Sequence, residues 1–296
     1  MNGSPADLMT AGILMPAAFP SAAACSEDSL CSLQRIACDP FFGFVEVDVP
    51  AACVAEIRAA MGERQVVLDV DAGGALYASG ASLCSLEPAG REHALAIARD
   101  AIDAATGLHA RSVSLVSGGD PGADERNDAL DALVASILVL YSYAKAAGDV
   151  ELALKMADRT VDKRFLIGPT IAGVSVAQRV RNTYPGFGLV LNLGHLPLLD
   201  EDPVMAAELA APFLSRVDIG NCIPGSGDTH PRFGVAGSAI DGAQLSRFLR
   251  ALVSTGYLAQ DQRKVVAFEV RPAPDEEPFE VIANSKQMLC DAWATA

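Results

Sequence analysis

The sequence predicts a single α/β domain folded as a (β/α)8 TIM barrel, on three observations. Short apolar or β-branched runs alternate with longer segments of helical periodicity, as in repeated βαβ units. Eight such runs can be counted, and 296 residues is a normal length for this barrel. No Gly/Ser linker or block of charge divides the chain, so residues 1–296 are expected to form one domain, with residues 1–10 as a flexible lead.

Each expected strand is a short apolar run that precedes a helical pattern or a turn. The expected strands cover residues 12–16, 44–49, 65–70, 112–117, 152–156, 188–193, 216–220 and 265–270. Apolar residues recur every three or four positions in the segments 91–105, 128–145, 174–182, 204–209, 243–253 and 280–293. These segments are therefore expected to be helices that cover the barrel.

An open, doubly wound sheet is the alternative arrangement for eight β/α units. That fold would need a glycine-rich phosphate turn such as GxGxxG after an early strand. Gly73-Gly74 and Gly118-Gly119 come nearest, and neither continues into the pattern. The sequence therefore favours the closed barrel.

The net charge of -15 argues against nucleic-acid and anionic-membrane partners, because phosphate groups would be repelled. No apolar run approaches the roughly 18–20 residues of a membrane span. Residues 13–24 are interrupted by Pro16 and Pro20, so they are interpreted as a strand and loop and not as a signal peptide. We therefore expect a cytoplasmic protein with a small-molecule substrate.

Seven cysteines are spread along the chain without CxxC spacing. Cys25, Cys31 and Cys38 come closest to a cluster, but their gaps fit no common zinc or haem pattern. An odd number of cysteines in a chain without a leader predicts reduced thiols, mostly packed as small hydrophobic side chains.

Polar residues interrupt the late strands at the ends that should face the barrel mouth. They are Lys155, Asn192, Asp218 and Glu269. A charge inside an apolar strand is costly unless it is paired or solvated, and functional residues of such barrels lie at the carboxyl ends of the strands. The alternative is that these residues form structural ion pairs or point between helix and sheet. Asp69 and Asp71, in an earlier strand, are expected to stabilise loops or solvate the rim.

Five segments resemble the xylose-isomerase-like TIM barrel superfamily of sugar phosphate isomerases and epimerases. They read ADRTVDKRFLIGPT, YPGFGLVLNLGHLPLL, VDIGNC, HPRFGVAGSAID and VVAFEVRP. The resemblance covers about residues 152–272 and is weaker over the first half. It implies a divalent cation at the mouth, held by a Glu, an Asp, a His and a Glu from strands five to eight, with the two Glu residues acting as acid and base.

Of the four ligand positions that the resemblance implies, this chain keeps only Glu269. Lys155 replaces the first Glu, Asn192 replaces the Asp and Asp218 replaces the His, whereas the neighbouring His195 is retained and would contact substrate. A protonated lysine cannot ligate a cation and would repel one. We therefore expect no metal and no cofactor, with Lys155 in place of the cation; the alternative is a divalent metal such as Mn, Mg or Zn.

The resemblance and these departures predict proton abstraction next to a carbonyl: isomerisation, epimerisation or a related elimination. Lys155 would donate a hydrogen bond to the developing oxyanion. Glu269 is the expected general base, with Asp218 or His195 as its acid partner. A desolvated Lys155 with a lowered pKa could instead form a Schiff base with a keto substrate.

Further mouth residues are expected to bind the carbohydrate-like or keto substrate. They are Asn192, Asn221, His230, Arg232, Arg271 and Glu46. Arg232 and Arg271 could hold a carboxylate or phosphate through paired hydrogen bonds. Barrels of this group often pair, so a homodimer is one expected assembly. Two other functions stay open: a metal-dependent isomerase whose ion is held by different mouth residues, and a non-catalytic barrel used for ligand binding.

Overall fold

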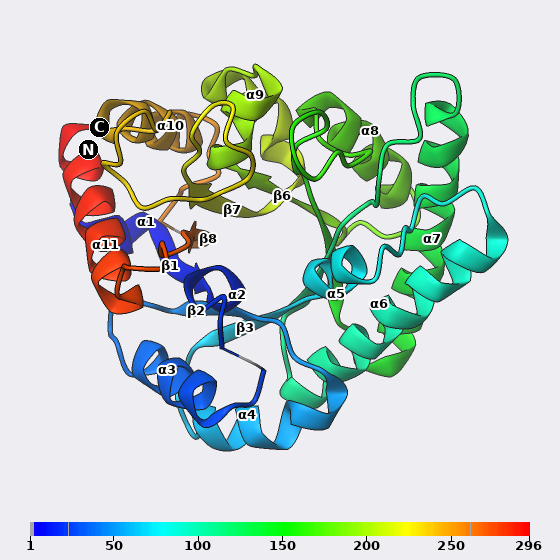
Figure 1. Cartoon of the computed structure of the whole chain (residues 1–296), viewed down its shortest axis with the longest axis horizontal. Helices are drawn as coiled ribbons and strands as arrows, with labels where there is room; N and C mark the ends of the chain where they lie inside the picture. Colours follow the sequence, from blue (N-terminus) through cyan, green and yellow to red (C-terminus); the bar gives the residue numbers. More distant parts are fainter. Residues whose placement is uncertain (1–2, 23, 261) are drawn as a thin grey trace.

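Eight parallel strands close into a barrel in which each strand pairs with its neighbours in the chain and β1 pairs with β8 (Figure 1). The strands are β1 (Met9–Leu14), β2 (Phe44–Val47), β3 (Val67–Asp71), β4 (Ser112–Leu115), β5 (Glu151–Lys155), β6 (Gly188–Asn192), β7 (Leu214–Gly220) and β8 (Lys264–Glu269). The structure is a computed structural model that describes every residue except 1–2, 23 and 261. The predicted (β/α)8 barrel is confirmed.

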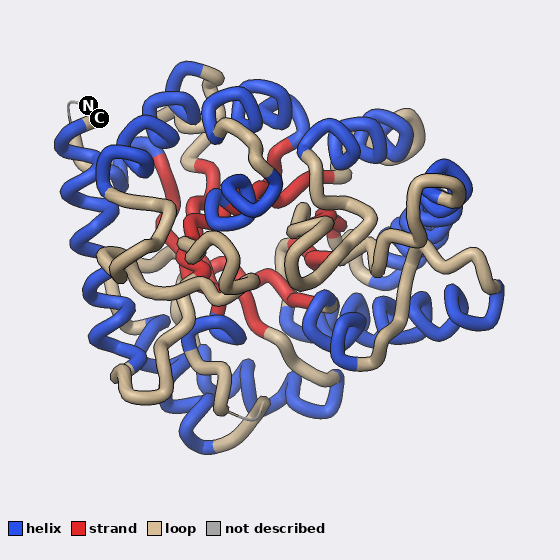
Figure 2. Tube along the Cα trace, turned by 45° about the horizontal axis from the view of Figure 1, so that its top comes forward, coloured by secondary structure: helices blue, strands red, loops and turns tan. Residues whose placement is uncertain are grey.

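Helices surround the strands as an outer ring (Figure 2). The longer ones are α3 (Glu27–Ala37), α4 (Val54–Met61), α6 (Pro88–Leu108), α7 (Arg126–Ala147), α8 (Thr170–Arg181), α9 (Pro203–Ala210), α10 (Gly242–Ser254) and α11 (Pro278–Thr295). The short ones are α1 (Pro5–Leu8), α2 (Met15–Ala18), α5 (Gly73–Ala78) and the 3₁₀ turns η1 (Ala51–Cys53), η2 (Leu193–Leu199) and η3 (Ala211–Phe213). All six predicted helices are present, whereas α3 and α4 were not predicted.

The chain enters the barrel earlier than expected. Residues 5–8, within the expected flexible lead, form helix α1, and β1 begins at Met9. A capping box explains the helix: the Ser4 hydroxyl accepts from the Ala6 N–H, and the Asp7 carboxylate accepts from the Ser4 N–H at 2.8 Å. The first strand also ends earlier than expected, at Leu14, so Pro16 lies in α2 and not in the strand.

Helix α7 is, among the described residues, the one helix long and apolar enough to cross a membrane by length and composition. It packs between α6 and α8 and against β5, and residues such as Leu133, Ile137 and Leu140 are buried there. A helix in the outer ring of a large barrel can be as long and apolar as a membrane span, because one side of it is buried against the strands.

The barrel interior combines a small apolar layer with buried charge. Leu14, Phe44 and Ala267 belong to the apolar cluster inside the ring. Gly12 is required beside it, because a Cβ at this position would overlap the Phe44 ring. Arg216 is 1% exposed, and its guanidinium carbon lies 5.4 Å from the centre of the Phe44 ring. The space above this layer forms the mouth.

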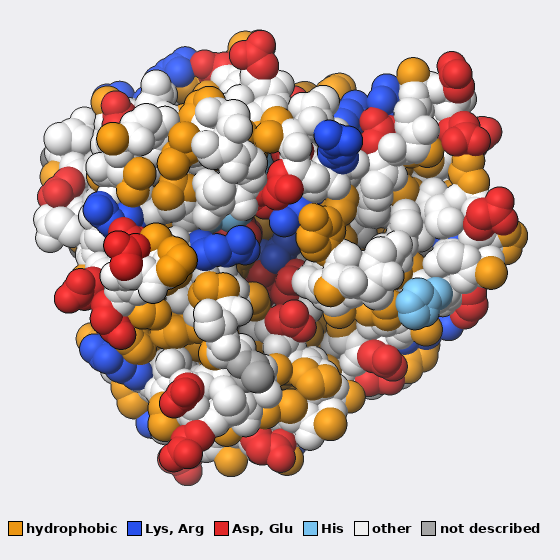
Figure 3. All heavy atoms as spheres, in the orientation of Figure 1, with side chains coloured by type: hydrophobic (Ala, Val, Ile, Leu, Met, Phe, Trp, Pro, Cys, Tyr) orange, Lys and Arg blue, Asp and Glu red, His pale blue; other side chains and the backbone are white. Residues whose placement is uncertain are grey.

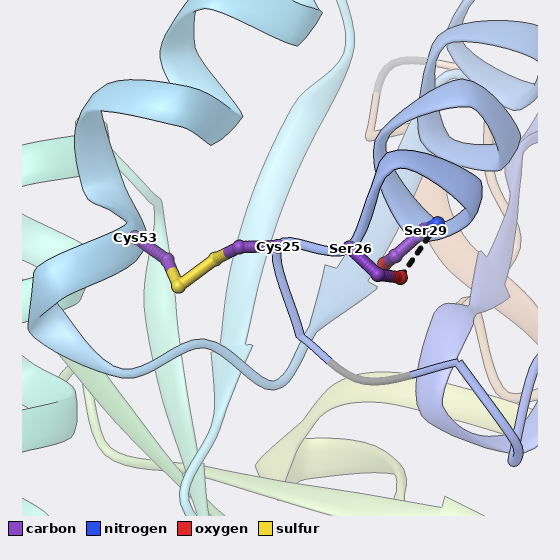
Figure 4. Close-up of a disulfide and its surroundings, with 4 residues drawn as sticks. All are labelled: Cys25, Ser26, Ser29 and Cys53. Atoms are coloured by element: carbon purple, nitrogen blue, oxygen red, sulfur yellow. Dashed lines mark hydrogen bonds between the residues drawn. A yellow bond between two sulfur atoms is a disulfide. The ribbon is translucent and has the colours of Figure 1, made fainter.

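Two of the cysteines are joined, in contrast to the expected reduced thiols. Cys25 and Cys53 form a disulfide with their Cα atoms 5.9 Å apart (Figure 4). It connects the segment between α2 and α3 to the turn η1 that follows β2. The five free cysteines divide into two buried (Cys84 and Cys222) and three exposed (Cys31, Cys38 and Cys290), so the expectation of mostly packed thiols is also wrong. The pairing could not be predicted because it depends on where two loops meet at the mouth.

Candidate active site

A cavity of about 210 Å³ opens at the carboxyl ends of the strands. Figure 3 shows it as a hollow near the centre of the face, with Lys and Arg side chains in and beside it and Asp and Glu side chains around it. Eight of the ten predicted site residues line this cavity: Glu269, Lys155, Asp218, His195, Asn192, His230, Arg271 and Glu46. For the five of these residues that lie on strands, the alternation of strand side chains explains the agreement, since every second residue of a barrel strand points inward. His195, His230 and Arg271 lie in the segments that follow the strands.

Asn221 and Arg232 do not line the cavity. Asn221 is fully buried, and its side chain donates to the Ile240 carbonyl and accepts from the Ile240 N–H, so it holds the loop after β7. Arg232 Nε donates to Glu276 Oε1 at 2.5 Å on the outer side of that loop. Neither residue is therefore placed where the predicted substrate-binding role would put it.

Lys155 is held at the end of β5 by two carboxylates from neighbouring strands. Its Nζ donates to Glu46 Oε1 at 2.6 Å and lies 2.9 Å from Asp71 Oδ1. Burial lowers the pKa of Lys155, but the charges of Asp71 and Glu46 outweigh it and raise the pKa above its usual value. The amine is therefore an ammonium, which removes the Schiff-base alternative because a protonated amine is not nucleophilic.

Asp71 holds the loop after β3, as expected, but it also lines the cavity. It is 8% exposed, and besides contacting Lys155 its carboxylate accepts from the backbone N–H groups of Gly73 and Gly74 at 3.1 and 3.0 Å. These contacts orient it toward β5. Asp69, the other aspartate assigned to the rim or loops, is also buried in the barrel, where it accepts from Arg111 at 2.6 Å.

Arg216 is the central cation of the barrel and was not singled out from the sequence. Its Nε and Nη2 donate to the two oxygens of Asp218 at 2.8 and 3.0 Å. Its Nη1 donates to Glu46 Oε2 at 2.6 Å and to Asp69 Oδ2 at 3.3 Å. A signal existed: Arg216 is a charged residue two positions before Asp218 in an apolar strand, and therefore on the same inward face.

The carboxylates of the mouth differ in acidity because burial, which raises the pKa, and neighbouring cations, which lower it, balance differently at each one. Burial raises the pKa of Glu46, but Arg216 and Lys155 outweigh it and lower the pKa to about 2. Burial raises the pKa of Asp218 to about 6; Arg216 opposes the rise, and the charge of Glu269 adds to it. Burial also raises the pKa of Asp48 to about 6, with a contribution from the charge of Asp71.

Glu269 closes β8 with its carboxylate in the cavity and its side chain 19% exposed. Asn192 Nδ2 donates to Glu269 Oε2, and Asn192 Oδ1 accepts from the Gly194 N–H at 2.7 Å. The second bond fixes which way the amide faces, so the Asn192 amide presents N–H groups to the carboxylate. Glu269 Oε1 lies 3.7 Å from His230 Nε2.

Asp228 joins two buried histidines on one side of the cavity and was not predicted. Its Oδ1 lies 3.0 Å from His195 Nε2 and 2.6 Å from His230 Nε2. Burial lowers the pKa of His195, but the charge of Asp228 outweighs it and raises the pKa to about 9. His195 Nδ1 also contacts the Met156 carbonyl at 3.1 Å, whereas neither ring nitrogen of His230 has a hydrogen bond of acceptable geometry within the described part of the chain.

A divalent metal does not fit the position that the resemblance predicts. There Lys155 brings an ammonium, Asn192 is turned with its N–H groups to the site, and both oxygens of Asp218 are bonded to Arg216. The cluster of His195, Asp228 and His230 is different, because one ligand atom from each lies within 4.8 Å of the other two. Two imidazoles and a carboxylate are a donor set that suits Zn²⁺.

Comparisons with known proteins agree on the architecture. Residues 39–288 match the family model of the xylose isomerase-like TIM barrel. A comparison with curated proteins finds no match.

Similar solved structures include AP endonuclease family 2 from Brucella melitensis, with a TM-score of 0.70, 17% identity and coverage of 93% of this chain and 97% of that chain. The IOLI protein with a binding zinc atom has a TM-score of 0.70, 15% identity and coverage of 97% and 99%. D-psicose 3-epimerase with D-tagatose from Clostridium cellulolyticum H10 has a TM-score of 0.66, 18% identity and coverage of 97% and 96%. At these identities the likeness is one of fold.

Proposed function

Because the chain belongs to the xylose isomerase-like TIM barrel family, we propose that it is a sugar isomerase- or epimerase-like enzyme that moves a proton next to a carbonyl without a metal ion. The observation that carries this proposal is Lys155, an ammonium held by Glu46 and Asp71 where relatives are expected to hold a cation. D-Psicose 3-epimerase and L-ribulose 3-epimerase, among the proteins of similar fold, act on sugars by their names, which supports a carbohydrate-like substrate.

Lys155 has one proton left for a substrate. An ammonium offers three donors, and Glu46 and Asp71 take two of them. The third can donate to a carbonyl oxygen in the cavity and stabilise the negative charge that develops there when the adjacent carbon loses a proton. The raised pKa of Lys155 keeps it charged through this step, so it acts as a hydrogen-bond donor and not as a proton source.

Glu269 is the general base and Asp218 its acid partner. Both carboxylates line the cavity, and the charge of Glu269 helps to raise the pKa of Asp218 to about 6, after burial as the larger cause. Two neighbouring carboxyl groups of different acidity can share the roles of base and acid. His195 is the alternative acid; its ring nitrogens contact Asp228 and the Met156 carbonyl, as the oxygens of Asp218 contact Arg216.

The test is exchange of substrate hydrogen for solvent deuterium, followed by NMR on a panel of ketoses including D-fructose and D-tagatose. Glu269→Gln should lower the exchange rate about 10²- to 10⁴-fold, the range for loss of a general base. Lys155→Met should lower it comparably, whereas Arg179→Gln, at a surface ion pair with Asp131, should not. Full exchange in Lys155→Met, or loss of exchange after removal of metals with a chelator, would contradict the metal-free mechanism.

A metal-dependent isomerase is the second candidate function, favoured by the His195, Asp228 and His230 cluster. These residues would hold the ion, and a bound Zn²⁺ would polarise a carbonyl or hydroxyl oxygen of the substrate. The test is the metal content of the purified protein. About one zinc per chain, lost in His230→Asn but kept in Lys155→Met, would favour this candidate; the absence of zinc after purification and after dialysis against zinc would exclude it.

A further inference from the structure

We propose that the mouth recognises an anionic carbohydrate-like substrate, whose carboxylate or phosphate is bound by Lys163 and Arg271. The inference rests on the proposed function, since it names the substrate class of the same site. Three exposed or half-buried cationic side chains line the cavity: Lys155, Lys163 and Arg271. They differ in the partners that they already have, and the cations with the weakest partners are the best placed to bind an anion.

Lys155 has two of its three donors occupied by carboxylates, and the proposed reaction uses the third at the carbonyl oxygen. Its Nζ is within 2.6 Å of Glu46 and 2.9 Å of Asp71. No donor of Lys155 is therefore left for a separate carboxylate or phosphate of the substrate. An anionic group must therefore be bound by the other two cations.

The Lys163 ammonium points at the cavity without a hydrogen bond among the described residues. Its closest carboxylate oxygens belong to Asp228 and Asp162, at 3.6 and 3.7 Å, which is beyond hydrogen-bond distance. The other oxygen of Asp228 is engaged by the two histidines, and the Lys163 ammonium also lies 4.4 Å from the centre of the Tyr77 ring. Lys163 is only 22% exposed, so its three donors are partly desolvated and lack strong partners.

Arg271 is the second cation that is available to an anion. It lies two residues beyond the end of β8 at Glu269, and its side chain is exposed. Its side chain forms no hydrogen bond or ion pair with the residues that the structure describes, although it lines the cavity. Arg232, the other arginine considered from the sequence, is bonded to Glu276 and lies outside the cavity. Lys163 thus takes the place that the sequence suggested for Arg232.

Both cations are mounted on fixed backbone. The buried Asp158 carboxylate accepts from the N–H groups of Val161, Asp162 and Lys163 at 2.7, 2.9 and 2.7 Å. The Arg271 N–H donates to the His230 carbonyl at 2.7 Å. The backbone from which each side chain starts is therefore fixed by the fold, which lowers the entropy lost on binding. An arginine fork and an ammonium are suited to a carboxylate or phosphate.

The negative net charge of the molecule means that binding of an acidic substrate would need these two cations. A chain with a net charge of -15 repels an anion in solution, so an acidic substrate needs local cations at the opening. A neutral sugar would leave the half-buried Lys163 ammonium with only the carboxylate oxygens at 3.6 and 3.7 Å and the Tyr77 ring beside it. The cavity of about 210 Å³ restricts the class to small acids.

The experiment is isothermal titration calorimetry with three matched ligands: D-fructose, D-fructuronate, which carries a carboxylate at carbon six, and D-fructose 6-phosphate. At least one of the two anions should bind about tenfold or more tightly than D-fructose, because a charge-assisted hydrogen bond contributes that much. Whichever anion binds better identifies the anionic group. Arg271→Gln and Lys163→Gln should each weaken anion binding about tenfold or more and leave D-fructose binding unchanged.

Arg179→Gln is the control, since it removes a surface arginine whose partner is Asp131; it should change neither affinity. Equal affinity for all three ligands would overturn the inference, and so would a loss of D-fructose binding equal to the loss of anion binding in the two variants. The outcomes that would overturn the proposed function are different from these. Preference for an anion without deuterium exchange would overturn the proton-transfer proposal only, and exchange of D-fructose without preference for an anion would overturn this inference only.

Discussion

At the scale of single residues, acidity in the mouth is decided by the balance between burial, which raises the pKa of a carboxyl group, and the cations beside it, which lower it. Glu46 contacts Arg216 and Lys155, and its pKa falls to about 2. Asp48 is partly buried beside the charge of Asp71, and its pKa rises to about 6. A group whose pKa is raised in the folded state costs stability wherever it is ionised.

Asp48→Asn should therefore stabilise the protein at high pH only. Above pH 6 Asp48 is charged in both states, and its charge costs the folded state about 3 kcal/mol; below its unfolded pKa, near 3.8, it is neutral in both and costs nothing. Urea unfolding should show a gain of up to about 3 kcal/mol at pH 8 and less than about 1 kcal/mol at pH 4. Asp131→Asn, at an exposed ion pair, should give no such difference. An equal gain at both pH values would disprove the assignment.

At the scale of elements, the loops of the first two strands are tied together at the mouth. The disulfide closes a loop with a sequence separation of 28 and joins the segment after α2 to the turn η1 (Figure 4). A second cavity of about 290 Å³ lies between these segments, lined by Phe19, Val49 and Ile57. Asp48 lines it as well, so the cavity beside the disulfide includes one of the carboxyl groups of the mouth.

Removal of this disulfide should destabilise the protein without changing its fold. By the loop-entropy relation, Cys25→Ser should lower the free energy of unfolding by about 3.5 kcal/mol, because the unfolded chain regains the freedom of the closed loop. A reducing agent should lower the melting temperature of the natural chain to that of the variant and leave the variant unchanged. Cys290→Ser, at an exposed free cysteine, should stay sensitive to the reducing agent. If the melting temperature of the natural chain does not change with the reducing agent, the disulfide does not contribute to stability.

At the scale of the whole molecule, charge and not hydrocarbon fills much of the barrel axis. Arg216 comes from β7 and contacts Glu46 from β2, Asp69 from β3 and Asp218 from its own strand. Three strands thus contribute charged side chains to one buried network. The three carboxylates depend on Arg216 for their stability in the fold, because without it their negative charges would be buried without compensation.

Arg216→Met should cost about 3–5 kcal/mol in the free energy of unfolding, the range for breaking a buried ion pair. Chemical denaturation is the measurement. Arg179→Met, which breaks an exposed ion pair on α8, should cost at most about 1 kcal/mol. Similar small losses in the two variants would show that the barrel does not depend on the network.

Much of the fold and part of the site follow from the sequence by itself. The alternation of short apolar runs with helical patterns determined the eight strands, and the polar residues Lys155, Asn192, Asp218 and Glu269 at strand ends line one cavity. The physical reason is local: a strand has a period of two residues, and parallel strands end at the same edge of the barrel.

Only the tertiary structure decided which of these charges are paired. Lys155 and Glu46 are 109 residues apart in the chain, and Arg216 and Glu46 are 170 apart. Whether an arginine such as Arg271 is free or, like Arg232, already bonded depends on loops that meet only when the ring closes. Ion pairs fall off within a few ångströms, so they are decided by distances in space that no local pattern of residues contains.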